Sequence, residues 1–226
     1  MDWRAVLGAL CWLATVQFVA AVFHVAVGMV DYAPTTQDLS VLGSGSCVRD
    51  TWANWSGWPC SPRGWLYNAS LVLHGALVAL GAGLLGGAVG WVALPRMSVL
   101  LIALGGIGGM VAGFQPHDAS ALIHGVGASA DLLLSALGIG AAGHSWREAW
   151  PIFARYCRAT AGLSLGGLAL YYLNLDAGLG RGTMELVAIV PLVVWFPVAG
   201  LVILASVARA GRPAASPSTA KAATEA

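Results

Sequence analysis

Six continuous runs of apolar residues constrain the fold of this chain more than any motif does. Each run is long enough, at about 20 residues, to cross a hydrocarbon core roughly 30 Å thick. We place the runs at residues 5–29, 66–90, 97–114, 122–143, 154–174 and 184–208. In lipid, only helices and closed barrels satisfy the backbone polar groups, and these runs lack the alternation of barrel strands. The sequence therefore predicts an all-α membrane bundle with six transmembrane helices.

The composition excludes two other classes of protein. The chain is 58% hydrophobic and 9% charged, whereas a soluble domain has about 25% charged residues. Its net charge of +1 and its scattered basic residues are not the electrostatic footprint of a nucleic-acid-binding protein. We therefore expect the partners to be the lipid bilayer, lipids within it or another membrane protein, and no nucleic acid.

The basic residues predict that both termini lie in the cytoplasm, because Lys and Arg concentrate in cytoplasmic loops. With the N-terminus inside, the cytoplasmic ends and loops carry Arg4, Arg96, Arg147, Arg155, Arg158, Arg209, Arg212 and Lys221. The outer side then carries Arg49, Arg63 and Arg181. We expect one transmembrane domain at residues 1–208 and a disordered cytoplasmic tail at 209–226, because the tail is small, polar and without periodicity.

The loop at residues 30–65 is the one sizeable soluble segment that we predict. It carries Trp52, Trp55, Trp58 and Trp65. Indole rings favour the headgroup region, so this loop is either a cap lying on the outer surface or an aromatic platform for a lipid or glycan.

Cys47 and Cys60 lie in the same loop, on the oxidising side, and we predict a disulfide bond between them.

Glycines within the apolar runs indicate close helix packing. The second helix contains small-xxx-small pairs, Gly83 with Gly87 and Gly86 with Gly90, and the third contains a glycine cluster at 105–109. Such residues allow membrane helices to approach closely. We expect the second and third helices to pack tightly against each other.

Polar residues inside the apolar runs are candidates for function. A carboxylate at the bilayer centre costs roughly 2.5 to 3.5 kcal/mol, so it is expected to face a partner or a cavity. At the helical rise, Asp131 lies roughly 13 Å and His74 roughly 12 Å from the outer ends of their helices, which allows the two to pair. Gln17 and Ser164 fall in a similar layer, and a shallower outer layer holds His24, Asp118, His124 and Glu185, with His117 beside them.

Three interpretations of these polar residues remain open. They can satisfy one another as interhelical hydrogen bonds. They can line a pocket open to the outside, with carboxylate and imidazole groups for acid–base chemistry on a lipid-linked substrate, with or without zinc. Alternatively, His24, His74 and His124 can ligate haem iron from facing helices, or the site can bind a quinone. No spacing in the sequence favours one cofactor, and the cofactor and any metal stay unknown.

Short motifs add a resemblance to a known family. They are Leu39–Gly45, reading LSVLGSG; Asn68 at the start of the second helix; Phe114–Asp118, reading FQPHD; and His124–Gly125. In this order they resemble the bacterial and archaeal membrane family catalogued as domain of unknown function 998. The resemblance implies about six helices and a bacterial or archaeal cell membrane, and it matches Ser40, Leu42, Gly43, Asp118 and His124 to the family motifs. Val41 occupies the position of the motif acid, with Asp38 as the nearest acid.

We therefore expect a multi-pass membrane protein with a polar pocket open to the outer leaflet, which binds envelope lipids or is a subunit of a membrane complex. The alternative is an intramembrane lipid hydrolase or transferase, with Asp118 and His124 as catalytic candidates. The expected pocket residues are His24, Ser40, His74, Asp131 and Glu185.

Alanine substitutions separate these interpretations. If Asp118 and His124 do chemistry, replacing either should abolish function and leave the yield of membrane protein unchanged. If Asp131 and His74 serve packing, replacing either should lower the yield instead. Intact yield and phenotype in all four variants would rule out the pocket.

Overall fold

The computed structural model describes residues 2–45, 61–90 and 92–210, and this part of the chain is helical with no strand. The helices are α1 (Trp3–Ala14), α2 (Val16–Gly28), the 3-10 helix η1 (Leu39–Gly43), α3 (Gly64–Gly86), α4 (Arg96–Phe114), α5 (Ala121–Ser145), α6 (Pro151–Tyr172) and α7 (Arg181–Ala210). The predicted all-α class is confirmed. Cys47, Cys60 and the tryptophans at 52, 55 and 58 lie outside the described residues, so the disulfide stays a prediction.

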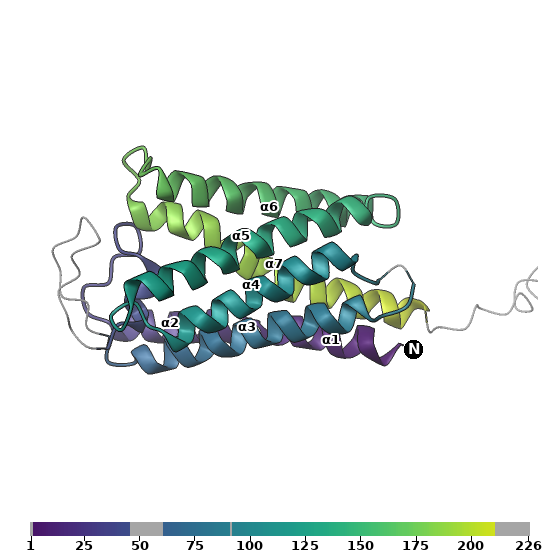
Figure 1. Ribbon diagram of the computed structural model, residues 1–226, viewed down its shortest axis with the longest axis horizontal. Coiled ribbons are helices and arrows are strands. Elements are labelled where there is room, and N and C mark those ends of the chain that lie inside the picture. Colours follow the sequence, from purple (N-terminus) through teal and green to yellow (C-terminus); the bar gives the residue numbers. More distant parts are fainter. Residues whose placement is uncertain (1, 46–60, 91, 211–226) are drawn as a thin grey trace, which may run out of the picture.

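Five of the described helices are long and apolar enough to cross a membrane, as in a multi-pass membrane protein. They are Trp3–Gly28, which joins α1 and α2, and α3, α4, α5 and α7. The sixth predicted span corresponds to α6, which is the least apolar of these helices and carries Arg155 and Arg158. The six-span count and the cytoplasmic termini therefore stay predictions. We use "outer end" for the end that this topology places outside, on the left in Figure 1.

The first predicted span is divided in two at Thr15. The Thr15 side chain donates a hydrogen bond to the carbonyl of Trp12 at 2.6 Å, and its backbone N–H donates to the same carbonyl at 3.2 Å. A threonine hydroxyl that takes a carbonyl of the preceding turn bends a helix. Thr15 is fully buried, so this break between α1 and α2 lies inside the bundle.

The helices form a closed ring that follows chain order. The α1–α2 pair packs against α3, and each later helix packs against the next as far as α7, which returns to α1 (Figure 1). Helices of alternating direction and short connections produce this arrangement. A ring of this kind leaves an axis that side chains must fill.

Aromatic side chains fill the inner half of the axis. The Trp12 ring lies 5.2 Å from that of Trp195 and 5.5 Å from that of Phe196, and all three side chains are at most 1% exposed. The Trp12 indole N–H donates to the carbonyl of Val78 on α3 at 3.2 Å, which satisfies its polar atom. Phe153 of α6 stacks against Trp195. The inner half is thereby closed.

The short helix η1 fills part of the outer half. Its residues Leu39, Val41 and Leu42 are buried, and the Asn68 amide of α3 donates to the Gly43 carbonyl at 2.9 Å. A Cβ at Gly43 would overlap the Asn68 amide oxygen and lie 3.0 Å from the ring of Tyr67, so a larger residue would require both side chains to shift. The LSVLG segment is therefore a plug between α2, α3 and α7, not a surface loop.

The predicted close packing of the second and third helices is present, but different glycines produce it. A Cβ on Gly106 of α4 would lie 2.5 Å from the carbonyl oxygen of Gly75 and 2.9 Å from the backbone nitrogen of Ala79 on α3. Gly83, which we expected at this interface, has nothing within 4 Å of the same position. The neighbours of α3 and α4 in the ring of helices determine which face of each helix lies at their interface.

Replacing Gly106 by Leu should lower the melting temperature of the protein in mild detergent, because the backbones of α3 and α4 must separate. Overpacking of this kind costs about 1–3 kcal/mol or more. The matched control, Gly83→Leu, adds the same side chain to an open face and should melt close to the unmodified protein. Equal melting temperatures for the two variants would contradict this packing.

Candidate functional site

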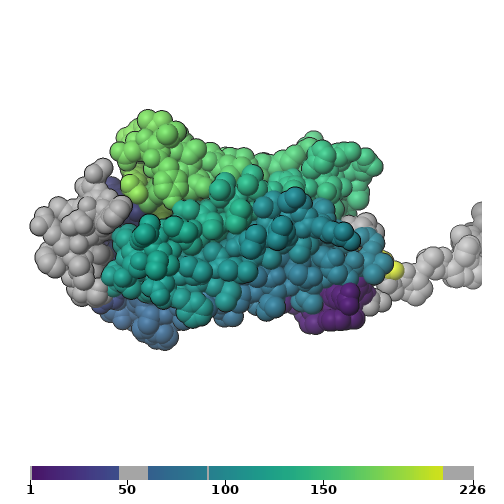
Figure 2. All heavy atoms as spheres, in the orientation of Figure 1, coloured from purple at the N-terminus to yellow at the C-terminus, as the bar shows by residue number. Residues whose placement is uncertain are grey.

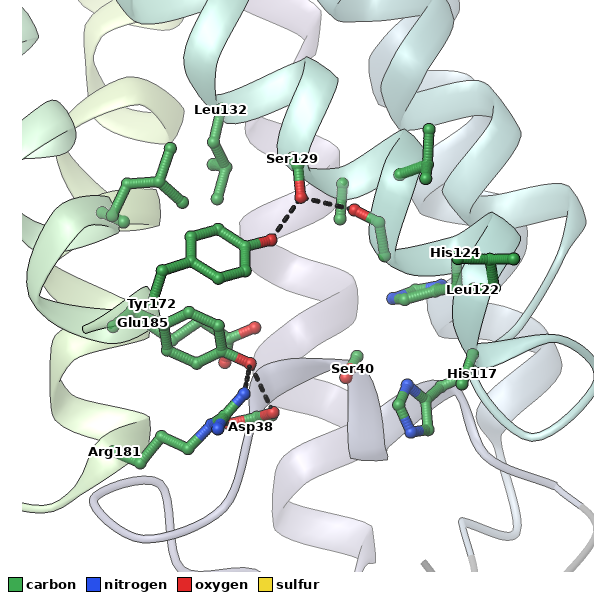
Figure 3. Close-up of a pocket in the computed structure, with 17 residues that line it drawn as sticks. Asp38, Ser40, His117, Leu122, His124, Ser129, Leu132, Tyr172, Arg181 and Glu185 are labelled. Atoms are coloured by element: carbon green, nitrogen blue, oxygen red, sulfur yellow. Dashed lines mark hydrogen bonds and ion pairs between the residues drawn. The ribbon is translucent and has the colours of Figure 1, made fainter. Parts of the chain in front are cut away.

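A cavity of about 600 Å³ opens at the outer end between α5, α6, α7 and the chain around η1 (Figure 3). We call it the outer cavity. Charged and polar side chains gather near η1, the start of α7 and the end of α6, and they are Asp38, Ser40, Tyr171, Arg181 and Glu185. The rest of the α5 and α6 wall carries the apolar side chains of Leu122, Val126, Leu132 and Leu168, together with the neutral polar groups of His124, Ser129 and Tyr172. These two regions give the cavity an amphipathic lining.

Asp38, Tyr171 and Arg181 form one connected network. Arg181 donates through Nη2 to the Tyr171 hydroxyl at 2.6 Å, and that hydroxyl donates to Asp38 Oδ2 at 2.7 Å. Arg181 Nε lies 3.4 Å from Asp38 Oδ1, and the guanidinium lies 4.1 Å from the centre of the Tyr171 ring. The positive charge of Arg181 is therefore already engaged by a carboxylate and an aromatic face.

Glu185 lies one turn after Arg181 on α7. Its carboxylate accepts a hydrogen bond from the backbone N–H of Leu39, the first residue of η1. An N–H at the start of a helical turn has no partner within the turn, and a carboxylate satisfies it well. Glu185 therefore anchors η1 and adds a second carboxylate beside Asp38.

His124 lies at the junction of the cavity with α4. Its Nδ1 is 2.9 Å from the Ala112 carbonyl oxygen and 3.1 Å from that of Gln115, at the end of α4. Both partners accept hydrogen bonds, so Nδ1 carries the hydrogen and the neutral ring has its lone pair on Nε2. Figure 3 shows the ring directed into the cavity, with His117 beside it.

The outer cavity is open sideways between α5 and α6. Leu122 and Val126 of α5 and Tyr172 of α6 line it, yet they are 73%, 62% and 61% exposed. Figure 2 shows the outer ends of α5 in teal and of α6 in green on this face. One hydrogen bond crosses the opening, between the Ser129 and Tyr172 hydroxyls. The opening faces the surroundings of the bundle, where the bilayer is expected.

A smaller cavity of about 60 Å³, the deep pocket, continues inward from the outer cavity. The two share Ser40, His124 and Glu185, and the deep pocket reaches Asp131 and His74. It has room for a few water molecules. Asp131 accepts a hydrogen bond from Ser135 at 3.3 Å, and His74, 3% exposed, has an Nδ1 without a partner among the described residues.

The predicted layer at the depth of Asp131 and His74 is thus a common pocket lining. No hydrogen bond joins the two side chains in the described structure. Two other polar residues of that layer do form interhelical hydrogen bonds, because Gln17 donates to the Ser70 carbonyl at 2.9 Å and Ser164 to the Ala188 carbonyl at 2.7 Å. Polar residues at this depth therefore either line the deep pocket or form hydrogen bonds between helices.

Two predicted site residues lie elsewhere. His24 is on the exposed face of α2, with its Nε2 3.0 Å from Arg63 Nη1, and it does not line either cavity. Asp118 accepts a hydrogen bond from the backbone N–H of Gly45 at 3.0 Å and also lies outside both linings. The predicted catalytic pair, Asp118 and His124, is not brought together inside a cavity. Ser40, His74, Asp131 and Glu185 do line the cavities, as expected.

Three residues of the site were not predicted as such: Asp38, Tyr171 and Arg181. Asp38 had one signal, as the nearest acid to the family motif. Arg181 had another, as a basic residue on the side where few are expected. Tyr171 had none, because a tyrosine at the end of an apolar helix is typical of any membrane interface.

The acidic side chains of the cavity affect the pKa of Tyr32, which lies nearby. Tyr32, on the chain between α2 and η1, has its pKa raised above the ordinary value by burial and then by the negative charges of Glu185 and Asp38. Within the described residues, no three His, Cys, Asp or Glu side chains converge as ligands for a metal ion.

Comparison with known proteins gives one match. A family described as "Protein of unknown function (DUF998)" matches residues 12–202. The matched range includes every described helix of the bundle at least in part, and all residues that line the two cavities. No curated protein and no solved structure matches the chain.

Replacing Arg181 by Met should destabilise the protein, because it leaves Asp38 and Glu185 without a cation. The double variant, Arg181→Met with Asp38→Asn, should recover part of the lost stability. The interaction energy between the two side chains should be on the order of 1–3 kcal/mol, a modest value because partial exposure to solvent weakens the ion pair. The measurement is the melting temperature of the four proteins of this cycle in detergent. Arg63→Met, at an exposed site, is the control and should change stability by less than about 0.5 kcal/mol. Additive losses would show that the two charges do not interact.

Proposed function

The chain belongs to the DUF998 family, described as of unknown function, and from its outer cavity we propose that it binds a lipid-like amphiphile. One observation carries the proposal: a cavity of about 600 Å³ has an ionic network at one end, a mainly apolar wall formed by α5 and α6, and a lateral opening between these two helices. Ligand sites of this size combine an apolar lining with a few placed polar groups.

The distribution of the lining supports one orientation of the ligand. The polar head group would lie against Asp38, Arg181 and Glu185 at the outer end, where water is near. The apolar chain would follow Leu132 and Leu168 and leave between α5 and α6 towards the bilayer. Burial of each CH₂ group would add about 0.8 kcal/mol to binding.

The closed inner half of the bundle supports entry of the ligand from the outer side. Trp12, Trp195 and Phe196 fill the axis below the deep pocket, so a ligand in the outer cavity has no path through the bundle towards the inner end. We infer a receptor or holding site for an amphiphile of the outer leaflet.

A lipid hydrolase or transferase is the second candidate, and the Nε2 lone pair of His124 favours it. This nitrogen is oriented by the carbonyls that hold Nδ1, as in a general base. With Asp118 outside the cavity, the acids that share its lining are Asp38, which pairs with Arg181, and Glu185, which is the candidate acid. In this case a bound lipid would be converted as well as held.

The proposal is tested by filling the cavity. Leu132 of α5 lines both cavities, whereas its neighbour Leu133 does not and is 42% exposed. Native mass spectrometry of the protein released from mild detergent should show a retained lipid for the unmodified protein and for Leu133→Trp. Leu132→Trp should lose it by about tenfold or more, because the indole occupies the space of the ligand.

Two outcomes would contradict amphiphile binding. An unchanged lipid mass on Leu132→Trp would place the lipid elsewhere on the bundle. A second protein chain retained in place of lipid, equally by both variants, would indicate a subunit of a membrane complex. A retained product mass that disappears in His124→Gln, while the intact lipid remains bound, would support the enzymatic candidate.

A further inference from the structure

We propose that the polar end of the outer cavity recognises an ammonium group, so that the ligand is an amphiphilic amine or an aminolipid. This inference rests on the proposed binding of an amphiphile and specifies its head group. It follows from three features of the lining: its charge balance, its hydrogen-bonding groups and its burial.

The outer cavity holds one more acidic side chain than it holds cations. Arg181 is the one Lys or Arg among the described residues that line the cavity, and it pairs with Asp38. The remaining carboxylate, Glu185, is held by a neutral backbone N–H. The deep pocket adds a further carboxylate, Asp131, which has a neutral serine as partner. A ligand with a positive charge would complement this lining.

The hydrogen-bonding groups of the lining also favour an ammonium group. A primary ammonium offers three donors and no acceptor. The lining offers acceptors to match: the carboxylates of Glu185 and Asp38, and the Nε2 of His124, whose Nδ1 carries the hydrogen. A phosphate or carboxylate head group would instead need an uncompensated positive charge, and the charge of Arg181 is already paired with Asp38 and stacked on the Tyr171 ring.

Burial gives this complementarity its weight. A carboxylate removed from water is costly unless a partner charge and hydrogen bonds compensate it. Asp38 has a side chain only 13% exposed, and its Oδ1 accepts no hydrogen bond although it lies 3.4 Å from Arg181 Nε.

An independent observation also indicates that a polar partner enters the deep pocket. The side chain of His74 is 3% exposed, lines the deep pocket and leaves Nδ1 without a partner among the described residues. Its ring lies between Phe18 and Phe196, which offer no acceptor or donor. A buried polar atom normally has a partner. A water molecule or a donor of the ligand, entering through the outer cavity, would supply it.

The test compares four probes on the intact protein in nonionic detergent at pH 7. Dodecylamine, dodecanol and dodecanoate share one chain and differ in head group, and propylamine has the head group without the chain. Ligand-induced shifts of the melting temperature give their affinities. We expect dodecylamine to bind about tenfold more tightly than dodecanol, with dodecanoate weakest and propylamine undetected.

Glu185→Gln is the decisive variant. The glutamine can still accept from the Leu39 N–H through its amide oxygen, so η1 keeps its anchor while the charge is removed. Its preference for dodecylamine over dodecanol should fall to about twofold or less, with dodecanol binding unchanged. The control Asp176→Asn removes one charge at the same end, outside the cavity, where its side chain accepts from the Gly178 N–H, and should keep the full preference.

The outcomes separate this inference from the function on which it rests. If dodecylamine and dodecanol bind equally, or if Glu185→Gln keeps the preference, the ammonium site is refuted while amphiphile binding remains. If propylamine binds as tightly as dodecylamine, the site belongs to a small free amine and the aminolipid is refuted. If no probe binds and Leu132→Trp changes nothing, both proposals fail.

Discussion

The outer end of this bundle depends on the way in which η1 is tied to the helices around it. The Leu39 N–H is bound by Glu185 of α7, and the Gly43 carbonyl by Asn68 of α3. The preceding turn is attached as well, because the Thr183 N–H of α7 donates to the Thr35 carbonyl at 3.1 Å. A segment buried at a membrane surface must satisfy its backbone polar groups within the protein, and these three bonds do so.

The same bonds create the site. With η1 fixed, Asp38 at its start reaches Arg181 and Tyr171, and Ser40 faces α5 across the outer cavity. Glu185 therefore has two roles, since it holds η1 and contributes the charge that is left over. If the proposed ligand binds Glu185, occupancy of the cavity and the position of η1 would be coupled through this residue.

The two halves of the ring axis differ in how they are filled. Large rings close the inner half with nearly no exposed surface, while the outer half keeps a cavity of about 600 Å³ and the deep pocket beneath it. Dense packing of apolar rings stabilises the fold, whereas an unfilled polar cavity destabilises it unless water or a ligand occupies the space. This asymmetry leaves space for a ligand at one end of the bundle only.

The sequence by itself determined the helices and their bounds to within a few residues, because length and hydropathy are local properties. It also identified Glu185 and His124 as residues of one polar layer, and the family resemblance added Ser40. Only the tertiary structure decided which faces turn inward, and it placed His24 and Asp118 outside the cavities and Asp38, Tyr171 and Arg181 at the polar end. It decided as well that Gly75 and Gly106, not Gly83, bring α3 and α4 together. The physical reason is that the rotation of a helix about its axis and the path of a loop are set by packing against segments distant in sequence, and local periodicity contains no information about either.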